Sequence, residues 1–277
     1  MRKLLACVLI LLFIMPACLA QTGVFRALSA GIVHYDDGRV RGGGLNSTQG
    51  VYDALSRAFG NSGGFISTMG LDFTKDELLY AISETFREAQ GADVSLVYIN
   101  AHGGAQSGTS WIETREGERL TAQELERTLR GIPGTVILLI DCCNSGGFIG
   151  EDGFEDGFTL PFRQNAFASD KYLVCASCTG EENSYRVASK NMEEENLSTA
   201  FARALCEGLG WDLVGDRSTS LKADADRDRR VTFAEIGAYA KRRCMYYLSA
   251  SSKEVQTVCI WPDTGALILA SRAVDIE

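Results

Sequence analysis

The sequence predicts an α/β fold in which helices cover both faces of a largely parallel sheet. Three observations predict it: short apolar runs recur along the chain, most of them are continuous rather than alternating, and helical patterns separate them. Continuous apolar runs are typical of strands that are covered on both faces. Strands that alternate with helices need crossover connections, which produce parallel pairing.

Six apolar runs are expected to form the strands, and the last of them is followed by one more short run. They lie at residues 24–33, 65–68, 94–100, 135–140, 172–176 and 257–261, with the additional run at 266–270.

Three helix starts share a reciprocal cap in which a glutamate follows a threonine by three residues. The boxes begin at Thr74, Thr121 and Thr232. Such a box satisfies two orphan backbone N–H groups in the first turn, so each threonine is expected to begin a helix. Apolar residues at four-residue spacing indicate two more helices, one stopping at Gly60 and one ending near Gly208.

Residues 1–20 have the order of a secretory signal peptide, followed by one domain over 21–277. Two basic residues precede an apolar run at 4–15, and small residues precede a cut before Gln21. Neither this run nor any later segment has the ~18 to 20 apolar residues of a membrane span. We therefore expect a secreted, extracytoplasmic protein without an integral membrane span. Lipoprotein anchoring at Cys18 is the alternative.

The chain is acidic. Its 277 residues carry a net charge of −9, and removal of Arg2 and Lys3 with the leader makes the remainder more negative. Such a surface argues against nucleic acid and anionic lipid as partners. It favours cationic polypeptides, although acidity that only aids solubility explains the charge equally well.

Two neighbouring strand ends carry the residue types of a catalytic dyad. The run 94–100 leads into His102, and the run 135–140 leads into a cysteine pair that ends in Cys143. Parallel sheets build their sites at such ends. A thiol becomes a strong nucleophile when a neighbouring base draws off its proton, and imidazole titrates in the useful range. The other histidine, His34, lies in a polar hairpin turn, so His102 is the expected base.

The plainer interpretation is that both groups are structural. Strand-end cysteines are commonly small buried hydrophobes, and a turn histidine commonly forms only local hydrogen bonds. The coincidence of the two at strand ends, each followed by glycines that let a substrate backbone approach, favours catalysis.

Both strand ends resemble motifs of a known family. Residues 96–104 resemble the histidine motif of caspases and metacaspases, and residues 141–146 resemble their cysteine motif. The resemblance to caspase-like cysteine peptidases extends over most of the chain. It implies a three-layer sandwich around a six-stranded, mainly parallel sheet in the order 2-1-3-4-5-6. It assigns the nucleophile to Cys143 rather than Cys142, while Asn144 replaces the histidine usual in metacaspases.

The resemblance implies a secreted cysteine endopeptidase with a His102–Cys143 dyad. Its partners are polypeptide substrates, an acyl-enzyme forms at a peptide carbonyl, and the backbone amides of Gly103 and Cys143 hold the oxyanion. This chemistry requires no cofactor. The rival hypothesis is a catalytically silent caspase-like binding module, spoiled by Asn144 or by a disulfide between Cys142 and Cys143.

The resemblance to metacaspases also predicts cleavage after Arg or Lys. In that family carboxylates read the side chain before the scissile bond, and Asp53 and Asp141 match them, with Asn100 as a further polar residue. Two carboxylates in one pocket repel each other, and an incoming cation relieves that repulsion. Caspases use arginines to hold aspartate, and neither strand-end motif contains one. The alternative is that Asp53 lies on a solvated helix face and Asp141 shapes the turn.

An acidic loop has the spacing of a calcium-binding EF-hand. Its matching residues are Asp224, Asp226, Asp228 and Glu235, but Arg229 replaces the usual glycine. A solvated loop before a capped helix explains the same residues.

Seven of the nine cysteines follow the leader, and an odd number cannot all pair. Cys175 and Cys178 have the C-x-x-C spacing of redox and zinc sites, yet a structural disulfide or two buried thiols is the favoured interpretation. A thiol oxidoreductase is a third functional hypothesis, although the motif lacks the expected place at a helix start.

Overall fold

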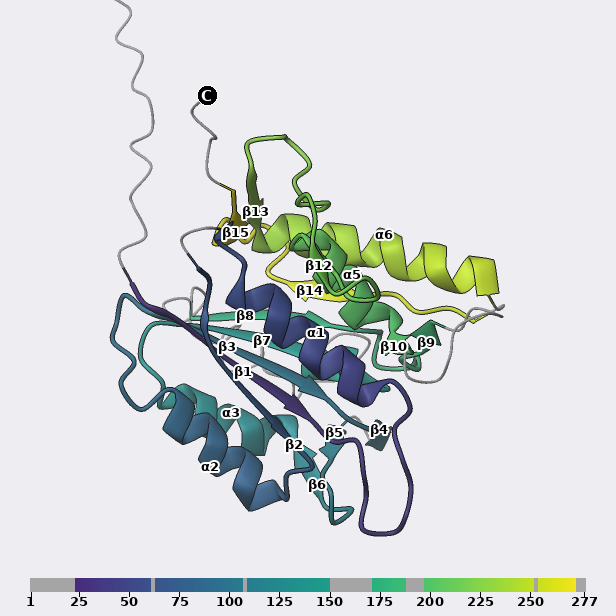
Figure 1. The fold of residues 1–277 in the computed structure, drawn as a ribbon. Coiled ribbons are helices and arrows are strands. Elements are labelled where there is room, and N and C mark those ends of the chain that lie inside the picture. Colours follow the sequence, from purple (N-terminus) through teal and green to yellow (C-terminus); the bar gives the residue numbers. More distant parts are fainter. Residues whose placement is uncertain are drawn as a thin grey trace, which may run out of the picture.

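A six-stranded sheet forms the centre of the molecule (Figure 1). The computed structural model describes residues 23–60, 63–106, 109–149, 171–187, 197–251 and 254–272, so the predicted signal peptide and Cys18 lie outside the described residues. The strand order is β14-β8-β7-β3-β1-β2, in which only β14 is antiparallel to its neighbour. The expected order of the six strands is confirmed. Their bounds are β1 (Phe25–Gly31), β2 (Ile66–Leu71), β3 (Val94–Asn100), β7 (Thr135–Asp141), β8 (Tyr172–Ala176) and β14 (Cys259–Trp261).

Helices cover both faces of the sheet, which confirms the three-layer sandwich (Figure 1). One face carries α1 (Gly44–Ser56), α5 (Ala200–Gly208) and α6 (Phe233–Ser251). The other carries α2 (Lys75–Thr85) and α3 (Ala122–Arg130). In the described part of the chain, no helix is both long enough and apolar enough to span a bilayer.

The capping boxes begin helices as expected. The Thr74 side chain accepts a hydrogen bond from the Glu77 N–H, and the Glu77 carboxylate accepts one from the Thr74 N–H. Thr121 caps α3 in the same way, and Thr232 does so at the start of α6. Each cap contributes about 0.5–2 kcal/mol.

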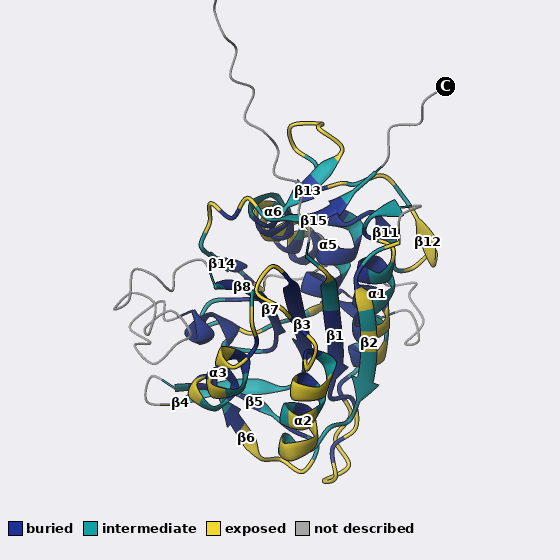
Figure 2. Cartoon of the chain, turned by 90° about the vertical axis from the view of Figure 1, so that its left-hand side faces the viewer, coloured by how far each residue is buried: buried dark blue, intermediate teal, exposed yellow. Residues whose placement is uncertain are grey.

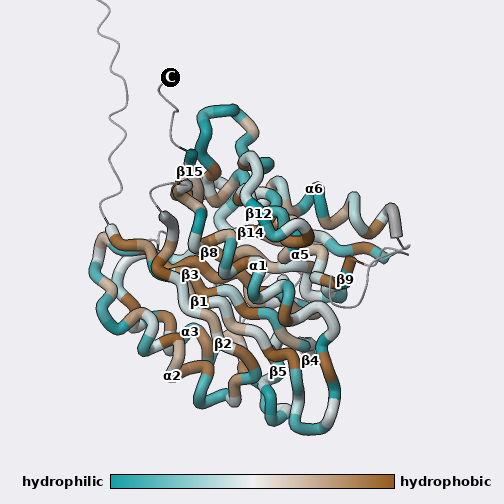
Figure 3. The backbone as a smooth tube through the Cα atoms, in the orientation of Figure 1, coloured by the Kyte–Doolittle hydropathy of each residue, from teal (hydrophilic) through white to brown (hydrophobic). Residues whose placement is uncertain are grey.

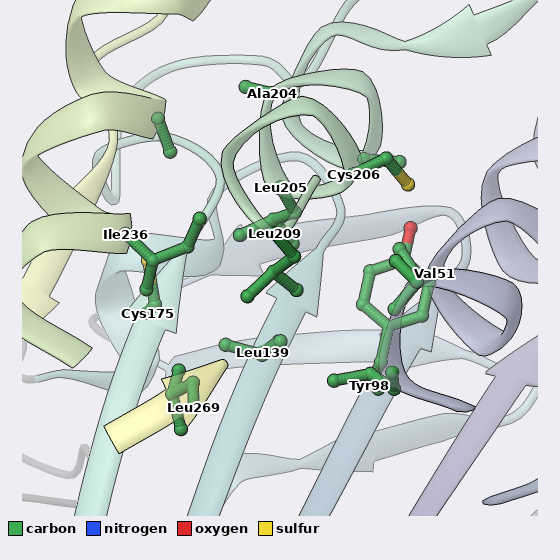
Figure 4. Packing of buried hydrophobic residues seen from close by; sticks show 14 of the residues in the cluster. Val51, Tyr98, Leu139, Cys175, Ala204, Leu205, Cys206, Leu209, Ile236 and Leu269 are labelled. Atoms are coloured by element: carbon green, nitrogen blue, oxygen red, sulfur yellow. The ribbon is translucent and has the colours of Figure 1, made fainter. Parts of the chain in front are cut away.

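Alternate residues of each central strand enter different cores, because successive strand side chains point to opposite faces. In β3, Leu96 and Tyr98 join the core under α1, α5 and α6, whereas Val97 and Ile99 join the core over α2 and α3. Figure 4 shows Tyr98 and Leu139 rising from the sheet toward α1 and α5. Each fully buried aliphatic side chain stabilises the fold by about 1.5–3 kcal/mol.

Burial and hydropathy follow the layers. The central strands β1 and β3 are buried, while the edge strand β2 is only partly covered (Figure 2). Hydrophobic residues concentrate along the central strands, and the loop that leads to Arg230 is hydrophilic (Figure 3). The continuous apolar runs in the sequence therefore correspond to strands covered on both faces.

Short strands outside the central sheet form four smaller sheets among the described residues. A small three-stranded sheet lies beyond the carboxyl ends of β1 and β3 (Figure 1), and three two-stranded ribbons lie elsewhere. The expected strand at 266–270 belongs to one of these ribbons rather than to the central sheet. The small sheet comprises β4 (Gly103–Gln106), β5 (Thr109–Glu113) and β6 (Arg119–Thr121), and the ribbons are β9 (Arg186–Val187) with β10 (Ser198–Thr199), β11 (Trp211–Asp212) with β12 (Arg217–Ser218), and β13 (Arg230–Thr232) with β15 (Ile268–Ser271).

Candidate active site

The two predicted dyad residues emerge side by side from the sheet. Strands β3 and β7 pair in parallel, and their last residues, Asn100 and Asp141, are register partners. His102 lies two residues after Asn100, and Cys143 lies two residues after Asp141, so both residues lie at the same edge of the sheet. Both side chains are partly buried. They line one cavity of about 240 Å³, together with Val40, Arg41, Gly42, Ser184, Tyr185 and Arg186.

The two adjacent cysteines have different environments. Cys142 is 1% exposed, and burial raises the pKa of its thiol well above the ordinary range. A thiol that cannot ionise is a poor nucleophile. Cys143 is less buried and lines the cavity, so the geometry favours it as the reactive thiol.

Cys142 instead explains why residue 103 is glycine. A Cβ on Gly103 would lie 2.6 Å from the Cys142 sulfur and 2.9 Å from the Trp111 carbonyl oxygen. Only a residue without a side chain fits there. The buried cysteine thus helps to fix the backbone immediately after the histidine.

Two backbone N–H groups are free to bind an oxyanion. The Glu113 N–H donates to the His102 carbonyl across the β4–β5 ladder at 2.9 Å, and hydrogen-bonded pairs alternate along an antiparallel ladder. The next pair, Gly103 with Ile112, is therefore not hydrogen-bonded, which leaves the Gly103 N–H free of the ladder. The Cys143 N–H has no acceptor among the described residues. The two expected oxyanion donors are thus both available.

The turn after Cys143 is held by Asn144. This residue has a φ of 59°, its side-chain amide donates to the Gly180 carbonyl at 2.7 Å, and its N–H donates to the Glu182 carbonyl at 2.8 Å. Asparagine tolerates the left-handed conformation better than most residues. Gly146 is required two residues on, because a Cβ there would lie 2.7 Å from the backbone of Gly180. Asn144 therefore shapes the turn, which explains how the site accommodates the departure from the metacaspase motif.

The pKa of His102 is lowered from its ordinary value of 6.5. Partial burial is the main cause, because desolvation disfavours the imidazolium. The positive charge of Arg41 adds to the effect and Glu113 opposes it, with smaller contributions from Arg39 and Asp37. A neutral imidazole is the form that can accept a proton from a thiol.

Asp141 is a fully buried hydrogen-bonding hub. Its carboxylate accepts hydrogen bonds from the Tyr98 hydroxyl at 2.9 Å, the Asn100 amide at 2.9 Å and the Ser184 hydroxyl at 2.8 Å. The Thr199 hydroxyl is a fourth donor. The structure therefore brings Asn100 and Asp141 together as expected, but internal donors occupy the carboxylate.

Arg41 lies in the position where an incoming cation was expected. Its Nε donates to the Asn100 side-chain oxygen at 2.8 Å, and its Nη2 donates to the Asp141 carbonyl at 3.2 Å and lies 3.8 Å from the Asp141 carboxylate. Arg41 is 7% exposed. The protein thus supplies its own guanidinium to the buried carboxylate.

A second arginine, Arg186, reaches the same cavity from β9. It is exposed, and no hydrogen bond or ion pair engages its guanidinium within the described residues. Gly42 makes room for it, since a Cβ at that position would collide with Nη1 of Arg186. Among the described residues the cavity lining contains two arginines and no carboxylate.

The fold resembles solved structures of other proteins. No protein-family model and no curated protein sequence matches the chain. Caspase-1 from Spodoptera frugiperda superposes with a TM-score of 0.61 and 16% sequence identity, covering 90% of this chain and 91% of that one. The chain has a caspase-like fold. Protein GSU0716 from Geobacter sulfurreducens is also similar, with a TM-score of 0.57 and 14% identity over 90% of this chain and 100% of that one.

Asp53 lies away from the dyad cavity of this caspase-like fold. It pairs with Arg57 at 2.7 Å and accepts a hydrogen bond from Gln49 at 2.9 Å, and it lines a different pocket together with Trp211. The end of α1 at Gly44 adjoins Asn100, and nine residues at 1.5 Å each place Asp53 roughly 13 Å further along the axis. The structure therefore does not bring Asp53 together with Asp141. The Asp53 side chain is only 15% exposed, so it does not lie on a solvated helix face either.

Three of the four predicted calcium ligands converge. Carboxylate oxygens of Asp224, Asp226 and Glu235 lie within 4.8 Å of one another. Asp228 is not in this group, and its side chain accepts a hydrogen bond from the Arg230 N–H at 2.8 Å. Exposed acidic groups often cluster without an ion, so calcium binding stays a sequence-based prediction.

The seven cysteines from Cys142 to Cys259 are all free thiols. Cys175 and Cys178 are buried, and burial raises their pKa values to about 12 and about 11. A redox pair needs an accessible thiol that ionises readily. The buried-thiol interpretation of the C-x-x-C spacing therefore describes the structure, and the oxidoreductase hypothesis gains no support.

Proposed function

We propose that the chain is a cysteine endopeptidase with Cys143 as nucleophile and His102 as general base. One observation carries the proposal: the two side chains share a cavity, and the backbone N–H groups of Gly103 and Cys143 have no acceptor among the residues that the structure describes. The caspase-like fold supports it, because a caspase is among the proteins with the same architecture.

The geometry supports acyl transfer in two halves. His102 takes the proton of Cys143, and the thiolate attacks the peptide carbonyl carbon while the Gly103 and Cys143 N–H groups stabilise the oxyanion. As the intermediate collapses, the C–N bond breaks and His102 returns the proton to the leaving amine. Water, deprotonated by His102, then attacks the thioester and releases the acid and the thiol. These steps use only groups of the chain and water.

Selective alkylation tests this assignment, because six buried thiols serve as internal controls. Iodoacetamide near neutral pH should modify Cys143 first and abolish hydrolysis of a mixed peptide library in proportion. His102→Ala should slow both reactions. Rapid alkylation of Cys143 without any hydrolysis would favour the rival hypothesis, a silent caspase-like binding module. Equal reactivity of several cysteines would contradict the dyad.

We further propose that the cavity prefers an acidic residue before the scissile bond, in place of the Arg or Lys expected from the sequence. Within the described residues the Arg186 guanidinium has no partner, and Arg41 provides a second positive charge, whereas the Asp141 carboxylate already has five polar neighbours. A substrate carboxylate would pair with Arg186 in a charge-assisted hydrogen bond. A substrate cation would face two arginines.

Fluorogenic peptides that differ only in the residue before the scissile bond test this preference. Aspartate should exceed arginine, lysine and alanine by roughly tenfold or more in kcat/KM, since a hydrogen bond to a charged group contributes about 1.5–3 kcal/mol. A preference for arginine or lysine would restore the specificity expected from Asp53, Asn100 and Asp141.

We propose that the protein is exported, and this proposal rests only on the signal-peptide pattern of residues 1–20. Mass spectrometry of the protein from a secreting host should find Gln21 as the first residue, and a lipid on Cys18 would identify the anchored form instead.

A further inference from the structure

We propose that Tyr35 is the positioning residue for His102, so that a hairpin before α1 orients the catalytic base. The inference rests on the proposed role of His102 and extends it to a residue outside both strand-end motifs. The hairpin comprises residues 33–41, in which His34 pairs with Val40 in an isolated bridge.

Tyr35 touches His102 in two ways. The His102 backbone N–H donates a hydrogen bond to the Tyr35 hydroxyl at 2.8 Å, and the two rings lie 5.1 Å apart between centroids at 39°. On its other side, the His102 carbonyl accepts from the Glu113 N–H at 2.9 Å. Tyr35 is 4% exposed, so water does not compete for its hydroxyl. The backbone of His102 is therefore held from both directions.

The imidazole itself needs such a restraint. Catalytic histidines are commonly oriented by a third side chain that accepts a hydrogen bond from the second ring nitrogen. Within the described residues, neither ring nitrogen of His102 has a hydrogen-bond partner. The contact with the Tyr35 ring and the fixed backbone therefore act as restraints on the direction of the imidazole.

The hairpin is attached at several points. Arg39 lies over the Tyr35 ring, 5.0 Å from its centroid, and donates two hydrogen bonds to Glu113, the residue that holds the His102 carbonyl. Asp72 accepts hydrogen bonds from the backbone N–H groups of Val33 and His34. These contacts form a closed ring through Tyr35, Arg39, Glu113 and His102, which resists rotation of the tyrosine.

The phenol keeps its proton throughout the working range. Burial raises the pKa of Tyr35 to about 12, so its oxygen stays a neutral acceptor. The charged groups that act on His102 are Arg39, Arg41, Asp37 and Glu113. Tyr35→Phe keeps the ring beneath Arg39, so it separates the loss of the hydroxyl from any movement of that charge.

The test compares Tyr35→Phe, which removes only the hydroxyl, with Tyr35→Leu, which also removes the ring. Tyr80→Phe is the matched control, because Tyr80 is 67% exposed on α2. We expect Tyr35→Phe to lower kcat about 5- to 50-fold with KM within twofold, and Tyr35→Leu to lower kcat further. The concentration of active enzyme in each preparation is determined by alkylation of Cys143. Wild-type kcat in Tyr35→Phe, or a loss of thermal stability with unchanged kcat, would overturn the proposal.

A second measurement does not depend on peptidase activity. The chain has two histidines, so proton NMR titration resolves the His102 ring, with a His34→Asn variant for assignment. Tyr35→Leu should raise the pKa of His102 toward 6.5 as water reaches the ring, while Tyr80→Phe leaves it unchanged. An unchanged pKa in Tyr35→Leu would contradict the ring contact. If the wild-type chain cleaves no peptide but shows this shift, the proposed function fails and the positioning role stands.

Discussion

Two pockets adjoin α1, and they carry opposite charge. The dyad cavity has a volume of about 240 Å³ and contains Arg41 and Arg186, whereas a pocket of about 290 Å³ further along the helix contains Asp53 and Asp216 with Trp211. The larger pocket has no cysteine or histidine among its described lining residues. Size therefore does not identify the active site here. The position relative to the carboxyl ends of β3 and β7 is what favours the smaller pocket as the candidate active site.

The charged side chains of the two pockets also differ in whether they have an ion-pair partner within the protein. Asp53 is paired with Arg57, whose guanidinium lies over the Trp211 ring at 4.5 Å. Arg186 has no such partner among the described residues. A charge without an internal partner is available to a ligand, so selectivity should depend on Arg186 and not on Asp53.

The largest expected effect separates the two cysteines at the dyad pocket. Cys143→Ala should lower kcat by about 10³-fold or more, because the nucleophile is lost, and His102→Ala should approach the same loss. Cys142→Ala should retain most of the activity, because its buried thiol contributes packing beside Gly103 and no chemistry. Single-turnover rates of the three purified variants provide the measurement. Equal losses in both cysteine variants would remove the distinction.

Arg186→Ala should produce the next largest effect. Loss of its guanidinium should lower kcat/KM for an aspartate peptide roughly 10- to 100-fold and leave an alanine peptide nearly unchanged. Arg186 is exposed and has no partner in the part of the chain that the structure describes, so the melting temperature should hardly change. Arg57→Ala, which removes the arginine that pairs with Asp53 beside the acidic pocket, is the control. A uniform decrease over all peptides would mean that Arg186 supports the fold or the dyad instead.

A smaller effect concerns pH and the charges around His102. The imidazole must be neutral to accept the Cys143 proton, and its pKa lies below 6.5, chiefly through burial and secondarily through Arg41. Activity should therefore persist below pH 6.5 and fall by half only at a more acid pH. Between the folded value and 6.5 the unfolded chain binds more protons, so stability should also decrease as the pH falls through that window. A pH profile of kcat/KM whose acid midpoint lies above 6.5 would show the opposite shift.

The sequence predicted the sheet and the dyad because their determinants are local. Continuous apolar runs mark β3 and β7, and equal lengths after a shared register place His102 beside Cys143. Capping boxes marked three helix starts for the same reason.

The sequence did not predict the pocket charges, because these depend on contacts between distant segments. Arg41 binds Asp141, which lies 100 positions away in the sequence. Tyr35 binds His102, which lies 67 positions away. Neither arginine belongs to a strand-end motif, and the hairpin carrying Tyr35 looked like an ordinary polar turn. The sequence also did not show that Asp53 lies away from Asp141, because helical spacing leaves open which turn of α1 adjoins the edge of the sheet. The buried Val51, Ala54 and Leu55 fix that orientation only once the helix is packed.

The smallest expected effect concerns Asp53. Asp53→Ala should change the preference between aspartate and arginine peptides by less than twofold, because the residue lies roughly 13 Å along α1 from Asn100. Its partly exposed i,i+4 pair with Arg57 contributes about 0.3–0.5 kcal/mol, so the melting temperature should fall only slightly. The measurement is the ratio of kcat/KM for the two peptides, with Arg186→Ala run beside it. A tenfold change in that ratio would connect the acidic pocket to the dyad pocket, and the two could no longer be treated as separate sites.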